Sequence, residues 1–136
     1  MPRRWTKTEA FEHFGTKLTN TRWSWSAISE DGSVIALVLW QDAVKGRDGK
    51  LVYHDDSEID AEWRKRPGHG ERIRHLAHCR DHLDGRFRAV IARAVDKEAD
   101  PRDIASCHPQ DGVWWELDEF DETTGAFVAH VVPAGA

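Results

Sequence analysis

The chain contains few cysteines and no long apolar run, and these two shortages exclude several classes of protein. Its 136 residues include only two cysteines, Cys79 and Cys107, so it is not a disulfide-stapled secreted domain. No apolar segment approaches the roughly 20 residues of a membrane-spanning helix, and the N-terminus lacks the apolar stretch of a secretory signal. We therefore expect one cytoplasmic domain over residues 1–136, with two free thiols, no membrane association and a core of its own.

Motifs of the common enzyme classes are also missing. The chain has no Gly-x-Ser-x-Gly elbow, and Gly68-His-Gly70 lacks the Lys-Ser/Thr ending of a phosphate-binding loop. Asp42, Asp55, Asp56 and Glu58 could serve a metal nuclease, but acidic residues beside turns are usually solvated. The sequence thus favours a binding module without a cofactor, and it leaves catalysis open.

Histidines on one predicted helix raise the question of a metal. His75, His78, Cys79 and His82 are spaced i, i+3, i+4 and i+7, and Cys107-His108 could add ligands from elsewhere in the chain. Zinc sites usually combine two separate pairs of closely spaced ligands, and the chain has no Cys-x-x-Cys. We therefore predict a histidine-lined flank of a helix with no metal, and a zinc site is the alternative.

The net charge of −5 conceals an uneven distribution. Residues 63–93 carry nine basic and three acidic side chains, whereas residues 94–136 carry two basic and ten acidic ones. A general binder of polyanions would be basic overall. The distribution permits one basic face that contacts phosphates while the remaining surface is acidic. A solvated helix with an ordinary mixture of charges is the alternative.

Periodicity and turn signals predict an α+β protein. Helices are predicted at 6–14, 56–66 and 70–83, and strands at 21–29, 34–40, 51–54, 87–95, 113–117 and 126–132. Residues 101–106 are expected to form a loop with one helical turn. Residues 34–40 are apolar on both faces, which predicts a central strand. The predicted fold is a small, mostly antiparallel, curled sheet or barrel flanked by helices.

Tryptophan is abundant, with seven residues against a single tyrosine. Trp23 and Trp25 share one face of the first predicted strand, and Trp40 ends the next strand, just before Asp42. Flat aromatic side chains can stack on a planar ring, while a carboxylate can accept a hydrogen bond from an exocyclic amine. Core packing is the alternative for these tryptophans.

Three segments together resemble the PUA-like group of domains, which includes the EVE and SRA-type readers of modified bases. They are residues 22–27 (RWSWSA), residues 39–42 (LWQD), and the stretch that runs from DGRFR at 84 to WWEL at 117. The likeness is nearest to the methylcytosine-reading domains that accompany HNH restriction nucleases. It implies a small curled sheet that holds a flipped or unpaired modified base, with 5-methylcytosine in DNA as the expected ligand.

The resemblance also assigns candidate residues. It places the base pocket at Trp23, Ser24, Trp25, Ser26, Trp40 and Asp42, with the tryptophans as walls and the polar side chains as readers of the base edge. The basic side chains expected on the phosphates are Arg22, Arg64, Lys65, Arg66, Arg72 and Arg74.

No HNH nuclease motif is present, so the resemblance implies a reading module whose nuclease would be a partner subunit or a domain acting in trans. Two other functions remain open at this point. One is a small enzyme or a small-ligand or metal-binding protein that uses the same concave surface. The other is a protein-interaction module anchored by Trp114 or Trp115, which must point to opposite faces of their strand.

Overall fold

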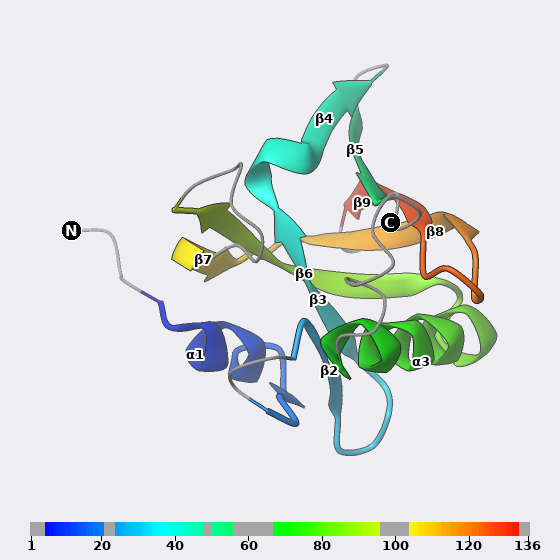
Figure 1. Ribbon diagram of the computed structural model, residues 1–136, viewed down its shortest axis with the longest axis horizontal. Helices are drawn as coiled ribbons and strands as arrows, with labels where there is room; N and C mark the ends of the chain where they lie inside the picture. Colours follow the sequence, from blue (N-terminus) through cyan, green and yellow to red (C-terminus); the bar gives the residue numbers. More distant parts are fainter. Residues whose placement is uncertain (1–4, 21–23, 48–49, 56–66, 96–103, 134–136) are drawn as a thin grey trace.

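The computed structural model describes residues 5–20, 24–47, 50–55, 67–95 and 104–133, and every structural statement below concerns these residues. In chain order the elements are α1 (Lys7–Glu12), β1 (Thr16–Lys17), β2 (Ser26–Ser29), β3 (Ile35–Trp40), the 3-10 turn η1 (Gln41–Ala43), β4 (Val44–Arg47), β5 (Lys50–Asp55), α3 (Pro67–His82), β6 (Arg86–Ala94), β7 (Ile104–Pro109), β8 (Val113–Phe120) and β9 (Phe127–Pro133) (Figure 1). No helix in these ranges is both long and apolar enough to cross a bilayer.

The nine strands in the described ranges form one open, mixed sheet. Its order is β1-β2-β3-β6-β8-β9-β5-β4, and β7 also pairs with β6. β3 and β6 are parallel, and the other strand pairs are antiparallel. The α+β class is therefore confirmed, and β3 lies inside the sheet as its apolar sequence predicts. A closed barrel, the alternative form of the prediction, is not what the described strands build.

Local signals in the sequence account for both described helices. Thr6 caps α1 through a capping box. Its hydroxyl accepts a hydrogen bond from the Glu9 N–H, and the Glu9 carboxylate accepts one from the Thr6 N–H, so both backbone N–H groups have a partner. α3 begins at Pro67, a first-turn position where the missing N–H costs no hydrogen bond. Beyond its end, Gly85 has φ 75° and donates its N–H to the carbonyl of Cys79, an arrangement in which glycine commonly ends a helix.

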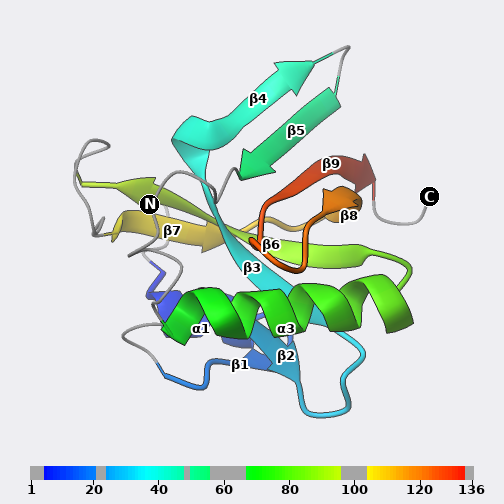
Figure 2. The same ribbon diagram turned by 45° about the vertical axis from the view of Figure 1, so that its right-hand side comes forward.

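The two helices cover opposite faces of β3 (Figure 2). On one face, Leu76 of α3 packs with Leu37 and Leu39 of β3 in the larger core cluster. On the other face, Phe11 of α1 packs with Val38 of β3 in a second cluster. Successive strand residues point to opposite faces, so β3 contributes to both clusters along its whole length.

Three parts of the predicted element order need correction or lie outside the described residues. Residues 104–106, expected in a loop, belong to β7, because β8 pairs only with the first residues of β6 and leaves the rest of that edge for β7. β4 was not predicted, since its sequence VKGR has no clear alternation. The helix predicted at 56–66 lies outside the described residues.

The buried contact between α3 and the sheet leads to a prediction on stability. We expect Leu76→Ala to lower the free energy of unfolding by about 2–5 kcal/mol, because Leu76 is fully buried and its removal leaves a cavity. The matched control is Leu51→Ala on β5, where the side chain is 39% exposed and the expected change is within about 0.5 kcal/mol. Urea denaturation measures both, and equal losses would contradict the described packing of α3.

Candidate functional site

Two half-buried tryptophans meet where β3 ends. Trp25, just before β2, and Trp40, the last residue of β3, have ring centroids 5.7 Å apart at an angle of 52°. The pairing of β2 with β3 brings them together, because the Val38 N–H donates to the carbonyl of Trp25. Both rings pack against the core cluster under α1 yet keep part of their surface exposed. We call this pair the aromatic wall.

Lys7 of α1 lies beside the aromatic wall. Its ammonium is 5.1 Å from the centroid of the Trp25 ring and donates a 2.8 Å hydrogen bond to the carbonyl of Ser24. Burial lowers the pKa of Lys7, while the nearby Cys107 and Glu71 act in the opposite direction. A cation over an aromatic face is attracted to the ring electrons, so this contact fixes Lys7 and Trp25 relative to each other.

On the opposite face of the same segment, Ser26 meets α3. The Ser26 hydroxyl and Nδ1 of His75 are 2.6 Å apart, and Ser26 is fully buried. Burial lowers the pKa of His75, the charges of Arg74 and His78 lower it further, and Glu71 opposes them. The imidazole is therefore held toward its neutral form, in which one ring nitrogen donates and the other accepts.

Glu71 lies one helical turn before His75 and is only 4% exposed. Within the described part of the chain, its Oε1 atom is buried and has no hydrogen-bond partner. Buried carboxylates are normally paired or hydrogen-bonded, because water otherwise solvates them far better. Most buried polar groups of native proteins have a hydrogen-bond partner, so this oxygen is an exception.

Together these groups can bind a planar, polar ring more readily than they can catalyse a reaction. The aromatic wall offers a partly exposed surface for stacking, and Lys7 offers N–H donors beside it. Ser26, by contrast, exposes no surface to a substrate. Burial also raises the pKa of the Cys79 thiol to about 12, which keeps it protonated and unreactive.

The predicted pocket residues divide between two faces of the sheet. Trp25 and Trp40 are in contact, and Asp42 follows in η1, half-buried. Ser24 is buried, and its hydroxyl accepts from the backbone N–H of Asn20. Ser26 points away from the aromatic wall toward α3. Trp23 lies outside the described residues, so the six-residue pocket as a whole stays a prediction.

The predicted phosphate contacts have different surroundings. Arg74 is exposed on α3, next to His75. Arg72 is only 4% exposed, and its guanidinium lies 5.2 Å from the centroid of the Phe127 ring, which places it inside the protein. The remaining basic residues lie outside the described ranges: Arg22, Arg64, Lys65 and Arg66.

The histidines of α3 have separate partners. His75 contacts Ser26, whereas Nε2 of His78 lies 2.9 Å from the carbonyl oxygen of Gly32. The rings of His78 and His82 are 4.9 Å apart. Among the residues that the structure describes, no three His, Cys, Asp or Glu side chains are gathered so that they could hold a metal ion. Cys79 and Cys107 are both free, as predicted.

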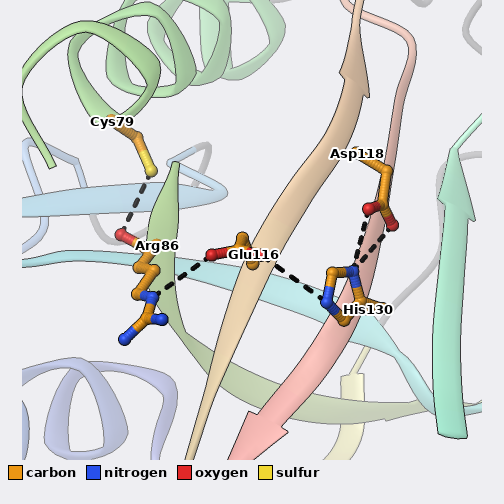
Figure 3. A network of polar contacts seen from close by, with 5 residues as sticks. All are labelled: Cys79, Arg86, Glu116, Asp118 and His130. Atoms are coloured by element: carbon orange, nitrogen blue, oxygen red, sulfur yellow. Dashed lines mark hydrogen bonds and ion pairs between the residues drawn. The ribbon is translucent and has the colours of Figure 1, made fainter. Parts of the chain in front are cut away.

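A second polar cluster lies on β6, β8 and β9 (Figure 3). Glu116 contacts Arg86 at 3.3 Å and His130 at 3.6 Å, while Nδ1 of His130 is 2.8 Å from the Asp118 carboxylate. These groups satisfy one another, which indicates a structural role for the cluster. On the same strand, Trp115 is fully buried and Trp114 is half-buried under the Arg88 guanidinium at 3.8 Å.

Lys7 and Glu71 were not among the predicted site residues, and His75 was predicted only as a candidate metal ligand. The burial of Glu71 could have been predicted, because Glu71 lies one helical turn before His75 on the side of the helix that Leu76 and Cys79 mark as buried. Nothing in the local sequence marked Lys7, because its role follows from the packing of α1 beside the segment that precedes β2.

Comparisons with models of protein families, with curated proteins and with solved structures gave no match.

The surroundings of His75 predict how stability depends on pH. The pKa of His75 is lower in the folded chain than the ordinary value of 6.5, so below that pH the unfolded chain binds more protons. The free energy of unfolding should consequently fall as the pH drops through 6.5 toward the folded pKa. Urea denaturation between about pH 7.5 and pH 5 measures this loss.

His75→Asn should make the pH dependence shallower, whereas His108→Asn, at an exposed position of β7, should leave it unchanged. An identical pH profile for the wild type and His75→Asn would rule out the described environment of His75.

Proposed function

We propose that this chain is a nucleic-acid-binding domain that reads a modified base, with 5-methylcytosine in DNA as the expected ligand. The observation that carries the proposal is the aromatic wall: Trp25 and Trp40 are in contact, partly exposed, and flanked by the Lys7 ammonium. A base is a flat ring with a polar edge, and this combination of a stacking surface with a nearby charged donor suits it. The resemblance to PUA-like readers agrees with this proposal.

Stacking alone would not supply the free energy needed to bind a base from a duplex. Extruding a base from a duplex costs a few kcal/mol. Stacking on an aromatic side chain contributes roughly 1–3 kcal/mol per base, so the aromatic wall can offset much of that cost. Contacts with the base edge and with phosphates must supply the remainder. A base that is already unpaired would bind with less of this cost.

Arg74 is the described candidate for a phosphate contact. It is exposed on α3, next to His75, whose side chain contacts the segment that carries Trp25. The proposal leaves out Arg72, because that side chain lies inside the protein over Phe127. Any cleavage of the bound DNA would belong to a nuclease partner or to a domain acting in trans.

The aromatic wall leads to the first binding prediction. We expect Trp25→Ala and Trp40→Ala each to weaken binding to a methylated duplex by about 5- to 150-fold, the range that corresponds to the loss of one stacking contact. Fluorescence anisotropy with methylated and unmethylated duplexes of one sequence measures the change, and circular dichroism checks the fold.

Trp114→Ala is the matched control, because Trp114 is also a half-buried tryptophan beneath a cation but lies on β8. The proposal fails when the wild type binds methylated and unmethylated DNA equally, or when Trp114→Ala weakens binding as much as Trp25→Ala.

The exposed arginine on α3 leads to a prediction on salt dependence. Arg74→Ala should weaken binding to all duplexes by a similar factor and reduce the slope of log K against log salt by about 1. Arg80→Ala is the control on the same helix, because Arg80 is also exposed but already contacts Asp81 at 2.8 Å and Glu122 at 2.9 Å. Equal slopes for Arg74→Ala and the wild type would exclude Arg74 as a phosphate contact.

A further inference from the structure

One arginine of β6 lies against two aromatic rings. The Arg88 guanidinium is 3.8 Å from the centroid of the Trp114 ring on β8 and 5.6 Å from that of Phe14, which follows α1. Its Nη1 atom donates a 3.0 Å hydrogen bond to the carbonyl of Val113. These contacts hold in one place a side chain that otherwise has many rotamers. We call Arg88, Trp114 and Phe14 the arginine cluster.

Most of the hydrogen-bonding capacity of Arg88 is unused in the described chain. A guanidinium has five N–H groups, and the bond to Val113 uses one of them. The Nε and Nη2 atoms have no partner among the described residues and are not fully buried. Arg80 differs, because it contacts two carboxylates. Asp111, in the turn before β8, contacts His13 at 2.7 Å and forms no ion pair with Arg88.

Neither described helix covers the face of β8 and β9 on which Trp114 lies. α1 packs on β1, β6 and β7, and α3 lies on the opposite face, where Trp115 is buried. Successive strand residues alternate between faces, so Trp114 and Val132, its partner on β9, both point away from α3. Both are half-buried and belong to neither described core cluster. This face therefore offers a partly exposed apolar pair beside a fixed guanidinium.

The charges around the arginine cluster indicate what this face would accept. Residues 104–133 carry six acidic side chains and no lysine or arginine. The successive phosphates of a nucleic acid would be repelled by these carboxylates. A peptide with one carboxylate and flanking basic side chains would meet complementary groups. Arg88 can bind its carboxylate, and exposed acids such as Asp111 and Asp118 can attract its basic side chains.

We propose that the arginine cluster and Val132 form the docking surface for a peptide segment of a partner protein. Arg88 binds a carboxylate of that segment, and Trp114 packs against an apolar side chain next to it. The planar fork of an arginine matches the two oxygens of a carboxylate, and it stacks on aromatic rings without losing those donors. Tryptophan and arginine are also the side chains that most often supply the affinity of protein interfaces.

The test begins with a selection of displayed random peptides on the wild-type chain, and fluorescence anisotropy then gives the affinities of the enriched peptides. We expect these peptides to share an acidic residue beside an apolar one, with basic residues nearby. Changing that acidic residue to its amide should weaken binding by about tenfold or more, the loss expected for a charged hydrogen bond. Arg88→Met should cause a similar loss, because methionine keeps an apolar stem over the rings but has no charge.

Two further variants separate recognition from packing. Arg80→Met is the matched control, because Arg80 also lies over an aromatic ring, that of Phe120, but its guanidinium already contacts Asp81 and Glu122. It should leave the peptide affinity unchanged. Arg88→Lys keeps the charge without the planar fork, so its affinity should lie between those of the wild type and Arg88→Met. Circular dichroism during heating checks that each variant is folded.

The docking surface is separate from the aromatic wall. Trp40 pairs with Ala92, which lies four residues along β6 from Arg88, so roughly 13 Å of strand separates them. Arg88→Met should therefore leave the affinity for a methylated duplex unchanged. A loss of DNA affinity as large as that of Arg74→Ala would assign Arg88 to a nucleic acid and overturn the proposal.

Three other outcomes would also overturn the proposed docking surface. The first is a selection that enriches no peptide. The second is a set of enriched peptides that bind the wild type and Arg88→Met equally well. The third is a wild-type dimer in sedimentation velocity that Arg88→Met converts to a monomer, because this face would then be an interface between two copies of the chain.

Discussion

The parallel pairing of β3 with β6 is the constraint on which the rest of the structure depends. It places Ala36 to Trp40 beside Arg88 to Ala92 in the interior of the sheet, where both faces must be covered. α3 covers one face and α1 covers the other. Because both helices pack on this narrow region, both also contact the start of β2: Lys7 of α1 donates to the Ser24 carbonyl just before the strand, and His75 of α3 contacts Ser26, its first residue. Lys7 and His75 therefore approach this segment from opposite faces of the sheet.

The same packing holds several polar groups away from water. Lys7 has a lowered pKa, His75 is held toward its neutral form, and Glu71 has a buried oxygen without a donor in the described chain. A domain of this size folds with a free energy of only about 5–15 kcal/mol, so such groups consume a meaningful part of its stability. The polar network on β6, β8 and β9 differs, because each of its charges has a partner (Figure 3).

Local sequence signals predicted most of the described helices and strands, but not the pairing of strands that lie far apart in the sequence. The capping box of Thr6, the helix ending at Gly85 and the apolar run of β3 each depend on neighbours in the chain. The helices predicted at 6–14 and 70–83 and the central strand predicted at 34–40 are confirmed to within a few residues. The parallel β3–β6 pair and the strand β7 depend on residues far apart in the sequence, where no local pattern reports them. The candidate site shows the same limit. The composition of the chain already showed an excess of tryptophan, whereas the contacts of Lys7 with Trp25 and Ser24 depend on tertiary packing.

The net charge of the chain constrains how the proposed reader would discriminate a modified base from other bases in DNA. With a net charge of −5, the long-range attraction of the chain to DNA is weak. Phosphate contacts position a protein without reading sequence, while contacts with the base supply discrimination. The proposed reader, with weak long-range attraction to DNA and an aromatic wall for stacking, would gain affinity chiefly where the correct base is present. Weak general binding combined with specific base contacts would suit a module that directs a separate nuclease to rare modified sites.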